Sequence, residues 1–252
     1  MLIDSPAIAL KAVDFKESSK IITFFTRSHG RLGVLVRGIK RKKSKYAGIM
    51  GYGAMLNIVV YYKASRSVQT LKEAEMRISN MHTRADFSRL ALSMSFLELV
   101  EQLAQEGEAN EPLYDFTEQV LQWLNQARPG DTNDWQAARL FPYLQLRLAD
   151  LMGVGMQLPG GAADARDLGC LNISSGRISA EPEEGDGLHF RLREAQRHYL
   201  ALAFGGRSAN LLTYAIHKPE LKQLISHLDQ YLRYHIDGVK PRKSDAVFDQ
   251  IL

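Results

Sequence analysis

The first eighty residues alternate short apolar, β-branched stretches with turn residues. This pattern predicts five strands, at about residues 6–12, 19–26, 32–37, 54–62 and 67–76. Glycines separate the stretches, as the bends of a tightly curled sheet require: Gly30, Gly33, Gly38, Gly48, Gly51 and Gly53. Five short strands in so short a segment favour a small barrel of the OB type.

From about residue 82 the apolar residues recur at steps of three and four, which places them on one face of a helix: Phe87, Leu90, Met94, Leu97, Val100 and Ala104. Asn110 with Pro112 begins a second helix, and a third could be capped by Asp131 or Thr132 and end at Gly153. A later amphipathic helix, which Gly238 can close, carries Leu221, Leu224, Ile225, Leu228 and Leu232.

These patterns together predict an α+β protein with two domains. Residues 1–80 form the barrel, and residues 81–252 form an all-α domain. The stretch 155–188 is rich in Gly, Ala, Asp and Glu, so we expect it to be an irregular connection or a small irregular subdomain.

The formal net charge of +4 conceals a large internal asymmetry. Residues 1–80 contain 15 Lys and Arg against 5 Asp and Glu, whereas residues 85–190 contain 6 basic against 17 acidic side chains. Such a division indicates that one lobe contacts a polyanion and the other does not.

The strongest local signal is the run Arg37–Tyr46, which places six cations in ten residues between two predicted strands. Cations set against phosphates release counterions, and nearby tyrosine rings can stack on bases. The alternative is a solvated loop whose neighbouring tyrosines are divided between core and surface. The candidate phosphate contacts are Arg27, Arg31, Arg37, Lys40, Arg41, Lys42, Lys43 and Lys45, with Tyr46 as a ring that could stack on a base.

Several segments of the N-terminal third carry a family resemblance: Ala7–Leu10, Glu17–Lys20, Thr26–Arg27, His29–Leu32, Arg37–Gly38, Lys43–Tyr46 and Leu71–Glu75. Fainter matches follow at Leu144–Leu148 with Gly153, and at Leu228–His235 followed by Lys243–Ser244. With these segments the chain resembles the RecO family of bacterial recombination mediators. The resemblance implies an OB-fold followed by a helical domain, binding to single- and double-stranded DNA, and annealing of complementary strands. It also implies that RecR and the tail of single-stranded DNA-binding protein are partners, so that RecA is loaded onto DNA.

One region departs from the pattern of that family, many of whose members carry four cysteines with zinc-site spacing in the part that corresponds to residues 160–190. Here Cys170 is the only cysteine, and His189 is the only other strong ligand in the stretch. Because a closed zinc site needs about four ligands, we expect neither zinc nor any other cofactor. The carboxylates Asp164, Asp167 and Glu181 are more typical of a solvated loop.

Patterns that would indicate catalysis are missing. The sequence has neither a Gly-x-x-x-x-Gly-Lys-Ser/Thr loop nor a His-Glu-x-x-His pair, and no local base adjoins Cys170. We therefore predict no catalytic residues and a protein that binds rather than catalyses. The runner-up is an adaptor whose basic lobe meets an acidic protein, and an enzyme acting on nucleic acid is third.

The location and partners of the chain can also be predicted. No apolar run reaches the roughly 18 to 20 residues of a membrane span, so a cytoplasmic, nucleoid-associated protein without membrane contact is expected.

In the acidic region, Arg139 and Arg147 adjoin Phe141 and Leu144. They could form an apolar groove with a cationic rim for an acidic tail that ends in an aromatic residue, or the arginines could simply pair with local carboxylates.

Overall fold

The computed structural model describes residues 1–126, 137–158, 168–184, 187–205 and 208–252. The chain divides into two compact units, Met1–Pro129 and Gly130–Leu252. The first unit therefore contains helices as well as the barrel. The suggested caps Asp131 and Thr132 lie outside the described residues, as do Asp164 and Asp167.

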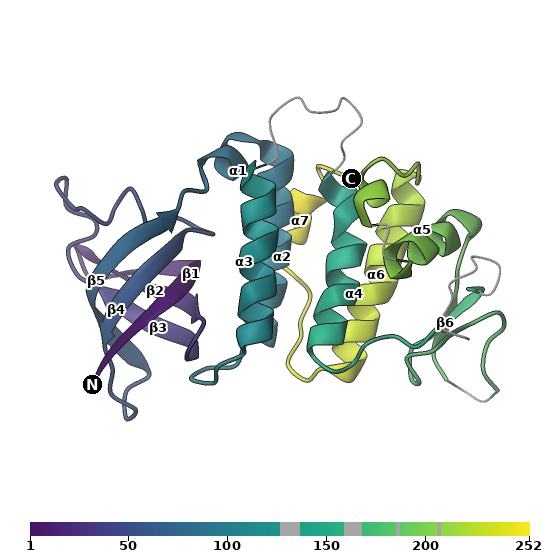
Figure 1. The fold of residues 1–252 in the computed structure, drawn as a ribbon, viewed down its shortest axis with the longest axis horizontal. Helices are drawn as coiled ribbons and strands as arrows, with labels where there is room; N and C mark the ends of the chain where they lie inside the picture. The colour runs from purple at the N-terminus through teal and green to yellow at the C-terminus, as the bar shows by residue number, and fades with distance from the viewer. Residues whose placement is uncertain (127–136, 159–167, 185–186, 206–207) are drawn as a thin grey trace. The chain divides into compact units, whose positions relative to one another are not determined.

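Five strands close into a barrel in the first unit (Figure 1): β1 (Leu2–Phe15), β2 (Ser19–Thr26), β3 (Gly30–Val36), β4 (Met55–Tyr61) and β5 (Val68–Ile78). Their order is β1-β2-β3-β5-β4, and all neighbours are antiparallel except β3 and β5. β1 is long enough to pair with β4 through its first half and with β2 through its second, past an irregularity between Ala9 and Lys11. This arrangement is an OB-fold, so the predicted fold class is confirmed.

Alternate residues of each strand fill the barrel interior, as the period of two requires. The buried set includes Ile22, Phe24, Leu32, Val34, Val36, Leu56, Ile58 and Val60. Burying one such side chain contributes about 1.5–3 kcal/mol, so this row of residues is the main source of barrel stability.

Three helices belong to the same unit: α1 (Met81–Ala85), α2 (Phe87–Leu103) and α3 (Glu111–Gln126). Asp86 caps α2 by accepting a hydrogen bond from the Arg89 N–H at 3.0 Å. Asn110 accepts one from the Leu113 N–H at 3.1 Å, which confirms the predicted start of α3. The buried part of α2 differs from its predicted face, since Leu92, Phe96 and Leu99 are also inside while Phe87 is exposed.

The loop between α2 and α3 is joined to the barrel by backbone hydrogen bonds. The Arg31 N–H donates to the Gln105 carbonyl at 2.9 Å, and the Gly107 N–H donates to the Arg31 carbonyl at 3.2 Å. Gly30 permits this approach, because a Cβ there would lie 2.1 Å from the Glu108 carbonyl oxygen and the residue has a φ of +57°. The helices are thus fixed to the start of β3.

The second unit contains α4 (Phe141–Leu151), α5 (Glu194–Phe204), α6 (Lys218–His235) and α7 (Asp245–Phe248), with short 3-10 helices at Ala137–Leu140 and Ser208–Leu212. The predicted amphipathic helix is confirmed as α6, whose leucines face the interior. Gly153 and Gly238 follow α4 and α6 with positive φ, as glycines beyond a helix end commonly do. No helix among the described residues is long and apolar enough to span a membrane.

A small three-stranded sheet with the order β7-β6-β8 also belongs to the second unit: β6 (Cys170–Asn172), β7 (Ile178–Ser179) and β8 (His189–Arg191). The expectation of irregular structure is therefore wrong for the residues of β6 and β7. The buried Asn172 amide holds the sheet together. It donates to the Arg177 carbonyl and to the Ser179 hydroxyl, at 3.1 and 2.8 Å, and accepts from the Glu183 N–H at 3.1 Å.

Candidate nucleic-acid interface

The segment between β3 and β4 begins with the basic loop, which we define as residues 37–46. Its backbone is anchored to the barrel, because Ile39 and Met50 are buried in the barrel core and Tyr46 packs against it. The Lys40 N–H donates to the Ser18 carbonyl at 3.1 Å, and Gly38 turns the chain with a φ of +69°. The loop thus has a fixed base on which its charged side chains are carried.

The six cations of the basic loop are all exposed: Arg37, Lys40, Arg41, Lys42, Lys43 and Lys45. Lys40 pairs with Asp14 at 3.0 Å, and the hydrogen bond from Lys40 is the main cause that lowers the pKa of that carboxyl group. Within the described ranges, no ion pair involves the other five. The structure therefore brings together most of the predicted phosphate contacts with their charge available to a polyanion.

The sequence suggests Tyr46 as a ring that stacks on a base, but its ring is in a different environment in the structure. Its ring is half-buried against the barrel core, its hydroxyl donates to the Lys72 carbonyl at 3.5 Å, and the Lys45 Nζ lies 5.1 Å from the ring centroid. The ring is an anchor of the basic loop in this conformation, and stacking on a base stays a prediction. Of the nearby tyrosines, Tyr62 packs against the core while Tyr61 is exposed, as the alternative interpretation holds.

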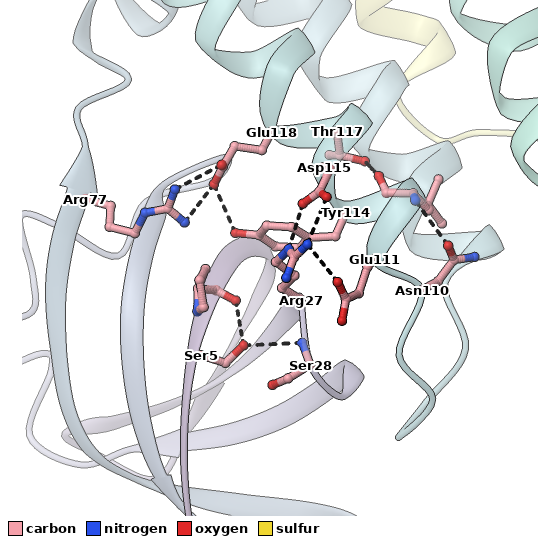
Figure 2. Close-up of polar contacts among 12 residues, drawn as sticks. Ser5, Arg27, Ser28, Arg77, Asn110, Glu111, Tyr114, Asp115, Thr117 and Glu118 are labelled. Carbon is pink, nitrogen blue, oxygen red and sulfur yellow. Dashed lines mark hydrogen bonds and ion pairs between the residues drawn. The ribbon is translucent and has the colours of Figure 1, made fainter.

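Arg27 lies at the barrel end next to α3 and not with the basic loop (Figure 2). Its Nε lies 2.8 Å from an Asp115 carboxylate oxygen, and its Nη2 lies 2.7 Å from Glu111. The hydrogen bond from Arg27 is the main cause that lowers the pKa of Asp115. These carboxylates occupy the positions where phosphate oxygens would have to bind, so Arg27 joins the barrel to the helices.

A second ion pair between the barrel and α3 is drawn in Figure 2. Arg77 of β5 lies 2.8 Å from Glu118, which also accepts a hydrogen bond from the Tyr114 hydroxyl at 3.2 Å. Arg31 lies at the start of β3, at the other end of this strand from the basic loop. It is half-buried, and its Nε is enclosed without a hydrogen-bond partner among the described residues. Arg27 and Arg31 thus lie apart from the six cations of the basic loop.

The turns beside the barrel strands carry cations that sequence reasoning missed. Lys16 lies in the turn between β1 and β2, and Lys63 and Arg66 lie in the turn between β4 and β5; all three are exposed. These are the loops that OB-folds use to bind oligonucleotides. The signal was available in the predicted strand ranges of the OB-type barrel, because all three cations fall between predicted strands.

The suggested partner site in the second unit changes in the structure. Phe141 and Leu144 are buried, and the Phe141 ring packs 4.9 Å from the Phe248 ring, so neither can line an exposed groove and that part of the prediction is wrong. Arg139 donates to the Leu212 carbonyl at 3.1 Å. Arg147 is exposed and lies 3.2 Å from Asp150, as the alternative of local pairing proposes.

The described part of the chain offers little evidence for a metal site or for a reactive cysteine. No group of three or more His, Cys, Asp or Glu residues lies close enough there to hold a metal ion. Cys170 is buried, and burial raises the pKa of its thiol, which disfavours the reactive thiolate. The absence of zinc stays a prediction, since two candidate carboxylates lie outside the described residues.

Comparison with known proteins identifies the family. The family model described as Recombination protein O N terminal matches residues 1–79, and the one described as Recombination protein O C terminal matches residues 84–245. The chain belongs to the RecO family. These RecO family matches cover the barrel and most of the remaining chain, and they divide near the predicted boundary at residue 80, although the first compact unit extends to Pro129.

Curated RecO relatives match along nearly their whole length. A DNA repair protein RecO of Salinibacter ruber is 27% identical over 252 residues, which cover 99% of this chain and 94% of the relative. Those of Chloroherpeton thalassium and Chlorobium phaeobacteroides are 24% and 27% identical, and the matches cover all of this chain and at least 99% of each relative. Family membership assigns the chain to DNA repair and recombination.

Proposed function

We propose that the chain is a recombination mediator that binds single- and double-stranded DNA through phosphates, with the basic loop as its main contact and without catalysing a reaction. The observation that carries the proposal is the basic loop itself, five of whose six exposed cations have no ion pair among the described residues. A polyanion relieves their mutual repulsion, and the released counterions add affinity. Readout of particular bases is not expected, because phosphate contacts carry no sequence information.

Annealing of complementary strands follows from the same charge. Two DNA strands repel each other until their phosphates are screened, so a cationic surface that holds both raises the rate at which they meet. In the cell we propose that the chain acts with RecR and with the tail of single-stranded DNA-binding protein, so that RecA is loaded onto DNA. Support for these partners comes from membership of the RecO family.

DNA binding is tested by fluorescence anisotropy of labelled single-stranded and duplex DNA over a range of salt concentrations. Lys42→Ala with Lys43→Ala should weaken binding to both forms and flatten the log-log salt slope by roughly 1.4 on a single strand, about 0.7 for each lost cation. Lys218→Ala with Arg233→Ala is the matched control, since it removes two exposed cations from α6. If both double variants behave like the wild type, the loop assignment is wrong. If the wild type binds acidic proteins but no DNA, an adaptor replaces the mediator.

The partner proposal has a separate test. We propose that the acidic tail of single-stranded DNA-binding protein contacts Arg147, which lies on the exposed side of α4. An acidic peptide ending in Phe should bind the wild type more tightly than Arg147→Ala. Asp150→Asn, which removes the competing carboxylate, should bind it at least as tightly as the wild type. Equal affinities for wild type and Arg147→Ala would remove this site.

A further inference from the structure

The outer face of β1, β2 and β3 carries apolar side chains that are exposed on β1 and half-buried on β2 and β3. Val13 pairs with Ile21, and Ile21 pairs with Leu35, so the three form one row across the strands, about 10 Å long at the usual strand spacing. Val13 is 53% exposed, and Phe15, the next outward residue of β1, is 36% exposed. We call Val13, Phe15, Ile21 and Leu35 the apolar strip.

Cations lie at both ends of the apolar strip. Lys11 precedes Val13 by two residues on the same face of β1, and Arg37 follows Leu35 by two residues at the start of the basic loop. The Lys16 Nζ lies 5.5 Å from the centroid of the Phe15 ring. No ion pair of these three cations is found among the residues that the structure describes. An aromatic ring with cations beside it is the arrangement that single-strand binding uses.

The opposite wall of the barrel carries three exposed carboxylates on its strands, with the exposed Lys72 as the cation beside them on β5. There Val59 of β4 lies between Asp4 and Glu73, which are its neighbours on β1 and β5, and Glu75 is opposite Asn57. All three carboxylates are exposed, and none forms an ion pair within the described ranges. Phosphates are repelled by this wall, so a bound strand is directed to the face that carries the apolar strip.

From these contrasts we infer that the apolar strip binds the bases of single-stranded DNA, with Phe15 as the stacking ring, and that it distinguishes a single strand from a duplex. The inference rests on the proposed function, since the basic loop first brings DNA to the barrel. A single strand can turn its bases toward the strip while its phosphates meet the flanking cations. The bases of a duplex are already paired and stacked, so a duplex meets only the cations.

Phe15→Ser tests the inference, with Tyr61→Ser as the matched control, because Tyr61 is an aromatic residue with 53% exposure on the acidic wall. Stacking of one base on one ring is worth on the order of tenfold in affinity. Phe15→Ser should therefore weaken single-strand binding by about that factor while leaving the salt slope and the duplex affinity unchanged. Tyr61→Ser should change none of these.

A second variant separates stacking from a loss of folding. Phe15→Trp should retain the single-strand affinity, and its fluorescence should be quenched by a single strand but not by a duplex. The strip is overturned if Phe15→Ser binds single strands as the wild type does, or if it loses affinity equally for both DNA forms. If the strip fails while Lys42→Ala with Lys43→Ala still weakens binding to both forms, the proposed function stands without it. Failure of the wild type to bind any DNA overturns both.

Discussion

Gly30→Ala should disrupt the contact between the barrel and the loop that joins α2 to α3. A Cβ at this position would lie 2.1 Å from the Glu108 carbonyl oxygen and 2.4 Å from that of Gln105, so the loop after α2 must move. The left-handed φ of +57° adds about 1–2 kcal/mol for a residue with a side chain. Moving the loop breaks the two backbone hydrogen bonds to Arg31, each worth about 1 kcal/mol. The expected loss of unfolding free energy is thus about 3–4 kcal/mol.

Gly38→Ala is the control for Gly30→Ala. It has a similar φ of +69°, but the nearest atom to its added Cβ is the flexible Arg41 side chain at 3.5 Å, so only the backbone strain of about 1–2 kcal/mol is expected. Urea titration gives the free energies, and hydrogen exchange of the Arg31 amide reports the local contact. The reasoning is refuted if Gly30→Ala is no less stable than Gly38→Ala and its Arg31 amide exchanges at the wild-type rate.

Three further changes have defined outcomes. Arg27 lowers the pKa of Asp115, so the charged carboxylate stabilises the fold above about pH 4. This stabilisation is lost as the pH falls through the lowered pKa that Asp115 has in the folded protein. Asp115→Asn should remove that part of the acid dependence in denaturation curves. Burial lowers the pKa of His227 to about 4, so His227 takes up a proton more readily in the unfolded chain. The free energy of unfolding should therefore decrease as the pH falls from about 6.5 to 4. His227→Phe, which can keep the stack on Phe190, should flatten this pH dependence. Asn172→Ala should destabilise the small sheet by about 2–4 kcal/mol, seen as faster amide exchange at its strands, because three hydrogen bonds are lost.

The barrel could be predicted from the sequence because each inward row repeats every second residue, and glycines mark the turns between the strands. The start of β1 was the weakest boundary. The first strand is predicted from about residue 6, yet β1 begins at Leu2. The pairing with β4 continues through Pro6, whose carbonyl accepts a hydrogen bond from the Arg27 N–H at 3.0 Å.

Side-chain roles were harder to predict where long-range partners decide them. Arg27 looked like a phosphate contact because it lies in a basic segment, but its partner Asp115 is 88 residues away. An apolar residue beside an arginine on a helix is equally typical of a groove and of a core, and only the packing of Phe248 shows that Phe141 is interior. The basic loop was predictable because five of its six exposed cations have no ion pair with a distant residue among those described.

Lysine footprinting with and without bound single-stranded DNA tests the central claim most directly. Under single-hit acylation, DNA should protect Lys42, Lys43 and Lys45 of the basic loop, while Lys218 and Lys222 of α6 react at the same rate in both states. Protection should disappear at high salt, where phosphate contacts are weak. Equal labelling of the basic loop with and without DNA, under conditions in which the DNA is bound, would contradict the assignment of this loop as the phosphate-binding surface.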